Sequence, residues 1–385
     1  MIDIVFLITD IHFGGGGERV TVNLANSFSK KGYKVTIVSV AVPHKTNIFI
    51  IQEGIKIDYL GIDFNKGLNT INKIRSVFKV RKYYKLHELE RNDSSTKPIS
   101  RIRGVETRHA LSLHEHTIVL GIGTYSNLLL SFLPYNKKIK RIGCQHCSYA
   151  SLNTFWRFLG KSFFKRLDVI VSLTERDVSN WKTLNRNVEV IPNAVSFYPG
   201  ERAFLRNKVI LAIGRIDHGK GYDLLMDVFE RFAAKEKEWC LRIIGEGPLK
   251  EKIKHRIDRQ GLGKRVQMLS PTDNVEEEYR QASVYLMTSR SEGLPMVLLE
   301  AKAFGLPIVS FDCETGPSDI IKEGKDGFLI ECFDVDEMAE KLGALCSDLS
   351  LRREFGSHGR EDVKRFFPEI VSQKWEGLFE DLKMR

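Results

Sequence analysis

Apolar runs typical of buried strands alternate with amphipathic helical stretches through both halves of this 385-residue chain. Neighbouring parallel strands need a long crossover connection, usually a helix, so the alternation predicts parallel sheets with helices packed on them. The length allows two domains, each large enough to bury its own core. The predicted fold class is therefore α/β, with two doubly wound, Rossmann-like domains.

The expected element boundaries follow from where the apolar runs stop. The predicted strands are 2–8, 35–40, 117–122, 139–143 and 169–172 in the first half, and 209–213, 241–244, 266–269, 284–287 and 308–311 in the second. A polar stretch separates the halves, which predicts a first domain at 1–197, a second at 198–369 and a final helix at 370–385. The polar, turn-rich segment 90–108 is expected to be a loop.

The composition, with 42% hydrophobic and 28% charged residues, is typical of a soluble globular protein. No run approaches the ~20 apolar residues that a membrane span requires. The first residues are typical of a strand and not of a signal peptide, because they have no basic start, so a cytoplasmic location is expected. Six scattered cysteines predict reduced thiols, and the C-x-x-C spacing of Cys144 and Cys147 lacks the second pair that a zinc site needs.

Positive charge is concentrated in the first half. Residues 1–197 carry 29 Lys and Arg against 15 Asp and Glu, a balance of +14, whereas residues 198–385 carry 30 against 34, a balance of −4. Two basic, aromatic stretches at helical spacing lie in that half, 73–85 and 155–166. Their aromatic residues either join the core beside a solvated face or dock on an anionic bilayer, and the charge balance favours the bilayer. No nucleic-acid-binding module is recognisable, so no nucleic acid partner is expected.

The segment 291–305 carries the most specific chemical signal. Gly293 frees the turn, Pro295 suits the first position of a helix, and a later Gly-Leu-Pro run ends that helix. Glu292 therefore lies at the mouth of the helix and Glu300 inside it. A helix amino terminus attracts phosphate, and a carboxylate on either side accepts hydrogen bonds from sugar hydroxyls. A nucleoside diphosphate sugar has this shape, although two glutamates at this spacing also occur by chance on solvated helices.

Glu292 and Glu300 match an E-x7-E motif, and essentially the whole chain resembles the retaining glycosyltransferases of the two-domain GT-B fold, family four. The resemblance implies that two domains face each other across a cleft, the first binding the acceptor and the second the nucleotide-sugar. It implies that the last helix crosses back to the first domain. It also implies that Glu292, with Gly293 and Leu294, contacts the donor sugar, and that Glu300 contacts the ribose.

The loop 214–221 matches a Gly-Arg…Lys-Gly motif of that family, whose two cations hold the donor diphosphate. Arg215 offers a planar fork and Lys220 a point charge, which suit a leaving group that gains negative charge. Such cations stabilise the departing phosphate where a metal ion is otherwise required, so no metal and no other cofactor is expected. The alternative is that both are solvated loop charges. Asp217 and His218 receive no role.

Three other features are expected near the ligands. Four glycines after the first strand let the backbone approach the acceptor or a phosphate: Gly14, Gly15, Gly16 and Gly17. They match neither the P-loop nor the dinucleotide-binding motif. The resemblance places His146 beside the donor sugar as an orienting group, whereas a lone histidine is often merely packed. Gly245 and Gly247 end another strand, where they are expected to approach the base.

One tempting motif is discounted. Asp334-Val335-Asp336 imitates the metal-binding D-x-D of the other large glycosyltransferase fold. It precedes a predicted helix, so Asp334 or Asp336 is expected to be a helix N-cap.

Together with these features, the resemblance implies a retaining glycosyltransferase that moves a sugar from a nucleotide-sugar, expected to be UDP-linked, to a glycan acceptor. The basic first half favours a lipid-linked acceptor and a peripheral protein at the inner face of the cell membrane, as in O-antigen, capsule or exopolysaccharide biosynthesis. Two alternatives stay open: a sugar-nucleotide epimerase or hydrolase of the same fold, and a non-catalytic protein that binds membrane surfaces.

Overall fold

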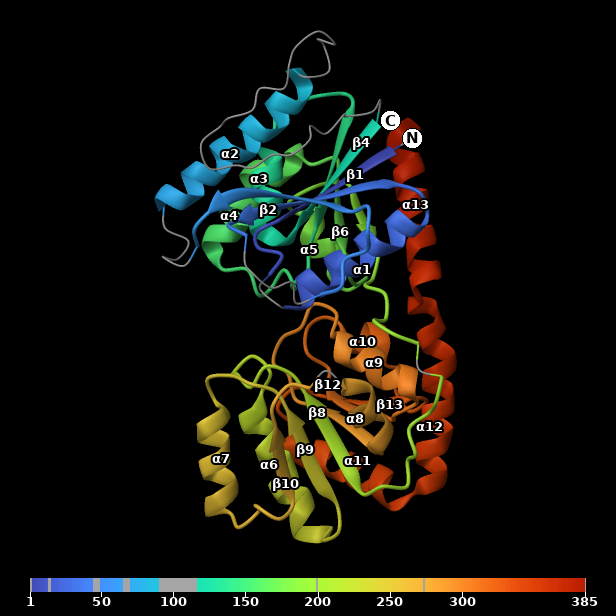
Figure 1. Cartoon of the computed structure of the whole chain (residues 1–385). Helices are drawn as coiled ribbons and strands as arrows, with labels where there is room; N and C mark the ends of the chain where they lie inside the picture. Colours follow the sequence, from blue (N-terminus) through green and yellow to red (C-terminus); the bar gives the residue numbers. More distant parts are fainter. Residues whose placement is uncertain are drawn as a thin grey trace. The chain divides into compact units, whose positions relative to one another are not determined.

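The computed structural model describes residues 2–12, 15–43, 49–64, 70–89, 116–198, 200–272 and 274–384 (Figure 1). The chain divides into two compact units, the first formed by Met1–Ile191 with Val371–Arg385 and the second by Pro192–Ile370. The first unit therefore leaves off at Ile191, whereas the sequence placed the boundary at 197. The predicted loop at 90–108 and Gly14 lie outside the described residues.

The described part of the first unit holds a seven-stranded sheet in the order β3-β2-β1-β4-β5-β6-β7, with all neighbouring strands parallel. The strands are β1 (Ile2–Ile8), β2 (Lys34–Ala41), β3 (Lys56–Ile62), β4 (His116–Ile122), β5 (Ile139–Cys144), β6 (Val169–Ser172) and β7 (Val188–Val190). The helices are α1 (Gly16–Lys30), α2 (Thr70–Leu89), α3 (Gly123–Ser131), α4 (Thr154–Phe163), the 3-10 turn η1 (Phe164–Arg166) and α5 (Val178–Lys182). The prediction omitted β3 because this edge strand alternates buried and partly exposed residues and has no continuous apolar run.

Successive side chains of a strand point to opposite faces of the sheet, and all seven residues of β1 are buried. Both faces of this sheet are therefore covered by helices. Val5 and Leu7 of β1 belong to a core that includes buried residues of α2, α3 and α5. On the other face, Phe6 stacks on Phe28 of α1 with 6.2 Å between ring centroids. Phe28 in turn lies 5.4 Å from Phe379 of the last helix, α13 (Pro368–Met384). The carboxyl-terminal helix is thus part of the core of the first unit.

The described part of the second unit holds a six-stranded parallel sheet in the order β10-β9-β8-β11-β12-β13. The strands are β8 (Val209–Ile213), β9 (Cys240–Ile244), β10 (Val266–Leu269), β11 (Val284–Met287), β12 (Ile308–Phe311) and β13 (Gly327–Ile330). The helices are α6 (Tyr222–Lys235), α7 (Lys250–Arg259), α8 (Val275–Gln281), α9 (Met296–Phe304), α10 (Pro317–Ile320), α11 (Val335–Ser347), α12 (Leu349–Asp362) and the 3-10 turn η2 (Val363–Phe366). Both sheets confirm the predicted α/β class, although β13 was not predicted.

In both sheets the strand order reverses beside the first strand, between β1 and β4 and between β8 and β11. At such a point the connections leave neighbouring strands toward opposite faces, which opens a crevice at the carboxyl ends where doubly wound folds bind ligands. Among the described helices, none combines the length and apolar composition needed to cross a membrane.

Candidate active site

The reversal point of the second unit brings together two charged residues that the sequence singled out. The loop after β8 carries Lys220, and the loop after β11 carries Glu292. The Nζ atom of Lys220 lies 2.6 Å from Oε1 of Glu292, and the Glu292 side chain is 9% exposed. The cation expected at the diphosphate and the carboxylate expected at the sugar are therefore neighbours.

Asp217, to which the sequence analysis gave no role, organises the loop that carries the cations. Its carboxylate accepts a hydrogen bond from the backbone N–H of Lys220 at 2.9 Å and one from Nε of Arg215 at 2.5 Å. Burial raises the pKa of Asp217, but these hydrogen bonds outweigh it and hold the pKa below its ordinary value. The guanidinium of Arg215 stays mostly exposed, so it remains accessible to an anion.

A second pair that the sequence analysis missed joins the two loops. Arg290, which follows β11, makes a bidentate ion pair with Asp223 of α6, with both N–O distances at 2.7 Å. The backbone N–H of Arg290 donates a hydrogen bond to the carbonyl of Gly219 at 2.9 Å. The guanidinium of Arg290 donates another to the carbonyl of His218 at 2.8 Å. Bidentate pairs fix orientation as well as distance. Arg290 thereby fixes the loop that carries Lys220 against the loop that carries Glu292.

Close loop packing accounts for three glycines at this edge. Gly221 has a φ of 66°, and a Cβ atom there would lie 2.0 Å from the carbonyl oxygen of Thr288. A Cβ atom at Gly245 would lie 1.9 Å from the oxygen of Gly214. A Cβ atom at Gly247 would lie 2.4 Å from the oxygen of Ile216. Side chains at these positions would push the loops apart, so the fold already requires glycine there, and the expected contact of Gly245 and Gly247 with the base stays a prediction.

The helix after Glu292 differs slightly from the predicted one. Pro295 is the N-cap residue before α9 and not its first residue, so that prediction was wrong by one position. Its ψ of 104° is extended and not helical, so the helix begins at the next residue, Met296. Glu300 lies inside α9 as predicted, where it is 2% exposed and accepts a hydrogen bond from the Tyr279 hydroxyl at 2.8 Å. Leu294 is buried beside the helix start.

The turn before α10 supports the Glu292 loop. Thr315 donates a hydrogen bond from Oγ1 to the carbonyl of Glu292 at 2.5 Å. Gly316 has a φ of 98°, and a Cβ atom there would lie 2.7 Å from the carbonyl oxygen of Gly293. The two loops therefore pack backbone to backbone, which holds Gly293 in place.

A buried lysine of α9 joins this helix to three other segments of the second unit. Lys302 is fully buried, and its Nζ donates to the carbonyl of Ile320 at 2.6 Å, to Asp326 at 2.9 Å and to Asp362 at 2.7 Å. All three ammonium protons therefore have acceptors, as a buried charge requires. Burial raises the pKa of Asp362, but hydrogen bonds from Lys302 and Lys322 outweigh it and lower the pKa to about 2.

The predicted residues of the first unit lie at the carboxyl ends of β1 and β5. Gly15 is the N-cap residue of α1 and has no side chain with which to cap it. A Cβ atom at Gly16 or Gly17 would meet no described atom within 4 Å. His146 follows β5, and neither of its buried ring nitrogens has a hydrogen-bond partner among the described residues. Burial lowers the pKa of His146 to about 4, so the ring is neutral at neutral pH.

The discounted motifs are structural. Asp334 caps α11, accepting a hydrogen bond from the N–H of Glu337 at 2.9 Å, which confirms the predicted N-cap. All six cysteines are free thiols, and burial raises the pKa of both Cys144 and Cys147. Across the described ranges, no group of three or more His, Cys, Asp and Glu side chains is placed to hold a metal ion. Whether the reaction needs a metal stays a prediction.

Known proteins resemble this chain in both sequence and fold. The family described as "Glycosyl transferases group 1" matches residues 199–362. A Haemophilus influenzae protein named as an uncharacterized glycosyltransferase is 30% identical over 97% of this chain and 98% of its own length. A Campylobacter jejuni alpha-1,4-N-acetyl-D-galactosaminyltransferase, named for a saccharide acceptor on PP-undecaprenol, is 25% identical over 100% of this chain and 99% of its own. A crystal structure of S. aureus TarM with Fondaparinux, alpha-GlcNAc-glycerol and UDP has a TM-score of 0.74 at 17% identity and covers 98% of this chain and 99% of that one.

Proposed function

Because this chain belongs to the group 1 family of glycosyl transferases and has the GT-B fold, we propose that it is a retaining enzyme that transfers a sugar from a UDP-sugar to a lipid-linked glycan. The observation that carries the proposal is the 2.6 Å contact between Lys220 and Glu292 at the reversal point of the second sheet. It sets a cation for the diphosphate beside a carboxylate for the sugar hydroxyls, and Arg215 adds a second, exposed cation to the same loop.

In the proposed reaction, the bond between the anomeric carbon and the diphosphate oxygen breaks, and a bond to the acceptor's hydroxyl oxygen forms on the same face of the sugar. The acceptor's proton moves to the departing diphosphate oxygen, so no protein nucleophile is required. Arg215 and Lys220 stabilise the negative charge that develops on this leaving group, a role that does not call for a metal ion or other cofactor.

The other residues hold the substrates. Glu292 accepts hydrogen bonds from the transferred sugar, together with the loop backbone at Gly293 and Leu294, and Glu300 accepts from the ribose. Buried polar groups are rarely left unpaired, so the two unpaired nitrogens of His146 are accounted for if each bonds to a hydroxyl of the substrates. Gly15, Gly16 and Gly17 leave room for the acceptor, in keeping with the open space beside Gly16 and Gly17.

The identities of donor and acceptor are supported by what similar proteins are named for. The TarM structure was solved with UDP, and the Campylobacter jejuni relative is named for an acceptor on PP-undecaprenol. We therefore propose a UDP-sugar donor and a diphospholipid-linked saccharide acceptor for this chain, and a role in the synthesis of a surface polysaccharide.

A surface on the first unit suits a lipid-borne acceptor. Phe78 of α2 and Phe155 and Phe158 of α4 are each more than half exposed. The Nζ atom of Lys73 in α2 lies 5.7 Å from the ring centroid of Phe155, so the two predicted basic, aromatic stretches meet. Exposed aromatic rings among cations are typical of segments that dock on anionic bilayers, which supports peripheral attachment at the inner face of the membrane.

The catalytic proposal is tested by Lys220→Ala and Glu292→Ala. Each variant should lose about 10²- to 10³-fold in kcat, because Lys220 stabilises the charge on the leaving group and Glu292 positions the transferred sugar. Transfer from UDP-sugars to a diphospholipid-linked saccharide is measured, with Lys254→Ala on the exposed face of α7 as the control. Unchanged melting temperatures show that the fold survives. Wild-type turnover in both variants would refute the site, and donor consumption without an acceptor would favour the hydrolase or epimerase.

The membrane proposal is tested separately by the double variant Phe155→Ser, Phe158→Ser. Its binding to phosphatidylglycerol vesicles in a sedimentation assay should weaken by about tenfold or more, because two rings lose their burial in the bilayer. Phe204→Ser with Phe333→Ser, which removes two comparably exposed rings from the second unit, is the control. Equal vesicle binding by both double variants would show that the α2 and α4 surface does not face the bilayer.

A further inference from the structure

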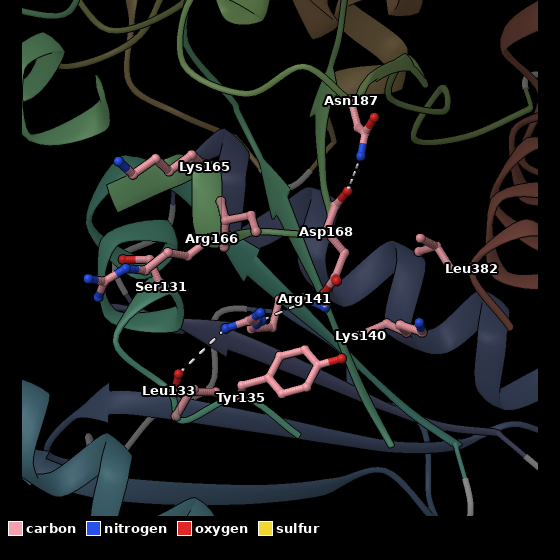
Figure 2. Close-up of a pocket in the computed structure, with 11 residues that line it drawn as sticks. Ser131, Leu133, Tyr135, Lys140, Arg141, Lys165, Arg166, Asp168, Asn187 and Leu382 are labelled. Carbon is pink, nitrogen blue, oxygen red and sulfur yellow. Dashed lines mark hydrogen bonds and ion pairs between the residues drawn. The ribbon is translucent and has the colours of Figure 1, made fainter. Parts of the chain in front are cut away.

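A cavity of about 560 Å³ in the first unit has no part in the proposed reaction (Figure 2). It lies at the amino ends of β5 and β6, between the end of α3, η1 and Leu382 of α13. Gly15 and His146 follow the carboxyl ends of β1 and β5. The cavity is therefore at the opposite edge of the same sheet from the predicted acceptor residues.

Positive charge dominates the lining of this cavity. Four cations, Lys140, Arg141, Lys165 and Arg166, line it together with one carboxylate, Asp168. No described carboxylate makes an ion pair with Lys140, Lys165 or Arg166. Unpaired cations around one hollow attract anions, since little nearby negative charge offsets them.

One of these cations, Arg141, is largely buried in the cavity wall. Arg141 is 10% exposed in its side chain, and its Nε lies 3.6 Å from the carboxylate of Asp168. Its Nη1 donates to the carbonyl of Leu133 at 3.5 Å. Asp168 is itself fixed, because it accepts a 2.6 Å hydrogen bond from the backbone N–H of Arg141. Because Arg141 is buried and has contacts on two sides, it has less freedom to lose on binding than an exposed cation.

The cations are spread along the cavity and do not surround one point. Figure 2 shows Lys140 and Lys165 on opposite sides of Arg141, with the ring of Tyr135 between Leu133 and Lys140. Tyr135 is 74% exposed, and Leu133 and Leu382 add buried apolar surface. Spaced cations suit an extended anion better than a single phosphate, and an aromatic ring beside apolar surface suits the C–H faces of sugar rings.

We propose that this cavity binds an acidic saccharide chain. The inference takes from the proposed function only that the protein handles glycans. A hollow does not match a flat bilayer, and the exposed apolar rings that suit a bilayer lie elsewhere, on α2 and α4. A charged glycan held here remains bound to the enzyme at an edge remote from the site of transfer.

The test measures binding of an oligogalacturonate to the full chain by calorimetry at low salt, with a maltodextrin of equal length as the uncharged probe. Lys165→Gln with Arg166→Gln removes two exposed cations that no carboxylate contacts, so the fold should be kept. Its Kd for the oligogalacturonate should rise roughly tenfold, the sum of two partly exposed ionic contacts. Lys252→Gln with Lys254→Gln on α7 removes the same charge from the second unit and should leave the Kd within twofold of the wild type.

Each outcome bears on the inference. Weaker oligogalacturonate binding in the Lys165, Arg166 variant alone, with no binding of maltodextrin, supports it. Unchanged binding in that variant overturns it. Equally tight binding of a single-stranded oligonucleotide of the same charge also overturns it, because the cavity would then recognise charge without sugar. Stabilisation of the protein by UDP-sugar is measured alongside, so that a failure of this inference is distinguished from a failure of the proposed donor site.

Discussion

The two units present loops at the carboxyl ends of similar sheets, yet they fix those loops differently. In the second unit, charged side chains are paired across loops, as in Lys220 with Glu292 and Arg290 with Asp223. In the first unit, Gly16 leaves open space and His146 has two unpaired ring nitrogens among the described residues. One edge is preorganised by ion pairs between its loops. At the other edge the loop after β1 is joined to neighbouring elements by hydrogen bonds, such as those between His12 and Tyr59 and between Thr9 and Ser126.

This difference suits the proposed reaction. A nucleotide-sugar donor always presents a diphosphate and a ribose, so fixed charges can be placed for it in advance without reorganisation during the reaction. Acceptor saccharides differ in shape, and an edge formed by glycines imposes fewer contacts. The three predictions below would weaken or sharpen the contrast.

The largest effect is expected where a buried charge holds the second unit together. Lys302→Met should lower the free energy of unfolding by about 3–5 kcal/mol, because Asp326 and Asp362 would be left buried without their shared cation. Urea denaturation followed by circular dichroism measures the change. Lys322→Met removes a 56% exposed partner of the same Asp362 and should cost about 1 kcal/mol or less. If Lys302→Met unfolds like the wild type, the second unit does not depend on its buried charges.

An effect of intermediate size is expected from His146 in the first unit. Its folded pKa of about 4 lies below the ordinary 6.5, so the unfolded state takes up the proton first as the pH falls. Stability should therefore be full above pH 6.5 and decline toward pH 4, by at most about 3 kcal/mol. His146→Gln should lack this part of the decline in urea unfolding measured across that range.

The control for the pH experiment is His358→Gln, which alters an exposed histidine of the second unit and should keep the wild-type profile. The Asp362 carboxylate does not interfere, because its lowered pKa confines its own loss of stability to pH values below about 3.8. An unchanged decline in His146→Gln would mean that the ring is paired or solvated in solution.

The smallest effect compares one glycine from each unit. Gly221→Ala should destabilise the protein by about 1–3 kcal/mol, because φ is 66° and the new methyl group would meet the Thr288 carbonyl. Gly16→Ala should change stability by less than about 0.5 kcal/mol, since no described atom is near. Thermal unfolding measures both. A larger loss for Gly16→Ala would show that the glycine loop of the first unit is as tightly packed as the loop that contains Gly221.

Much of this architecture was predictable from local pattern. Apolar runs located the buried strands, and short motifs located Lys220, Glu292 and Glu300. The edge strands β3 and β13 were missed. In β3, buried and partly exposed residues alternate, so the continuous apolar run that identifies a central strand is absent. Pro295 was predicted to be the first helical residue but is the N-cap. Its φ suits both positions, and only its ψ distinguishes them.

The supporting residues were missed for a different reason. Arg290 and Asp223 are 67 positions apart, and Lys302 and Asp362 are 60 positions apart. In the sequence they are ordinary charged residues. The pairs exist because β8 and β11 are neighbours and because α12 packs on α9.

The sequence by itself determined the repeating strand and helix pattern, the division into two parts and the charged residues proposed to bind a donor, because each depends on the chemistry of near neighbours. The tertiary structure alone decided which charges meet, which glycines are sterically required and that a basic cavity lies at the far edge of the first sheet. Those outcomes depend on the order in which strands pair, and a chain reveals that order only when distant segments pack against one another.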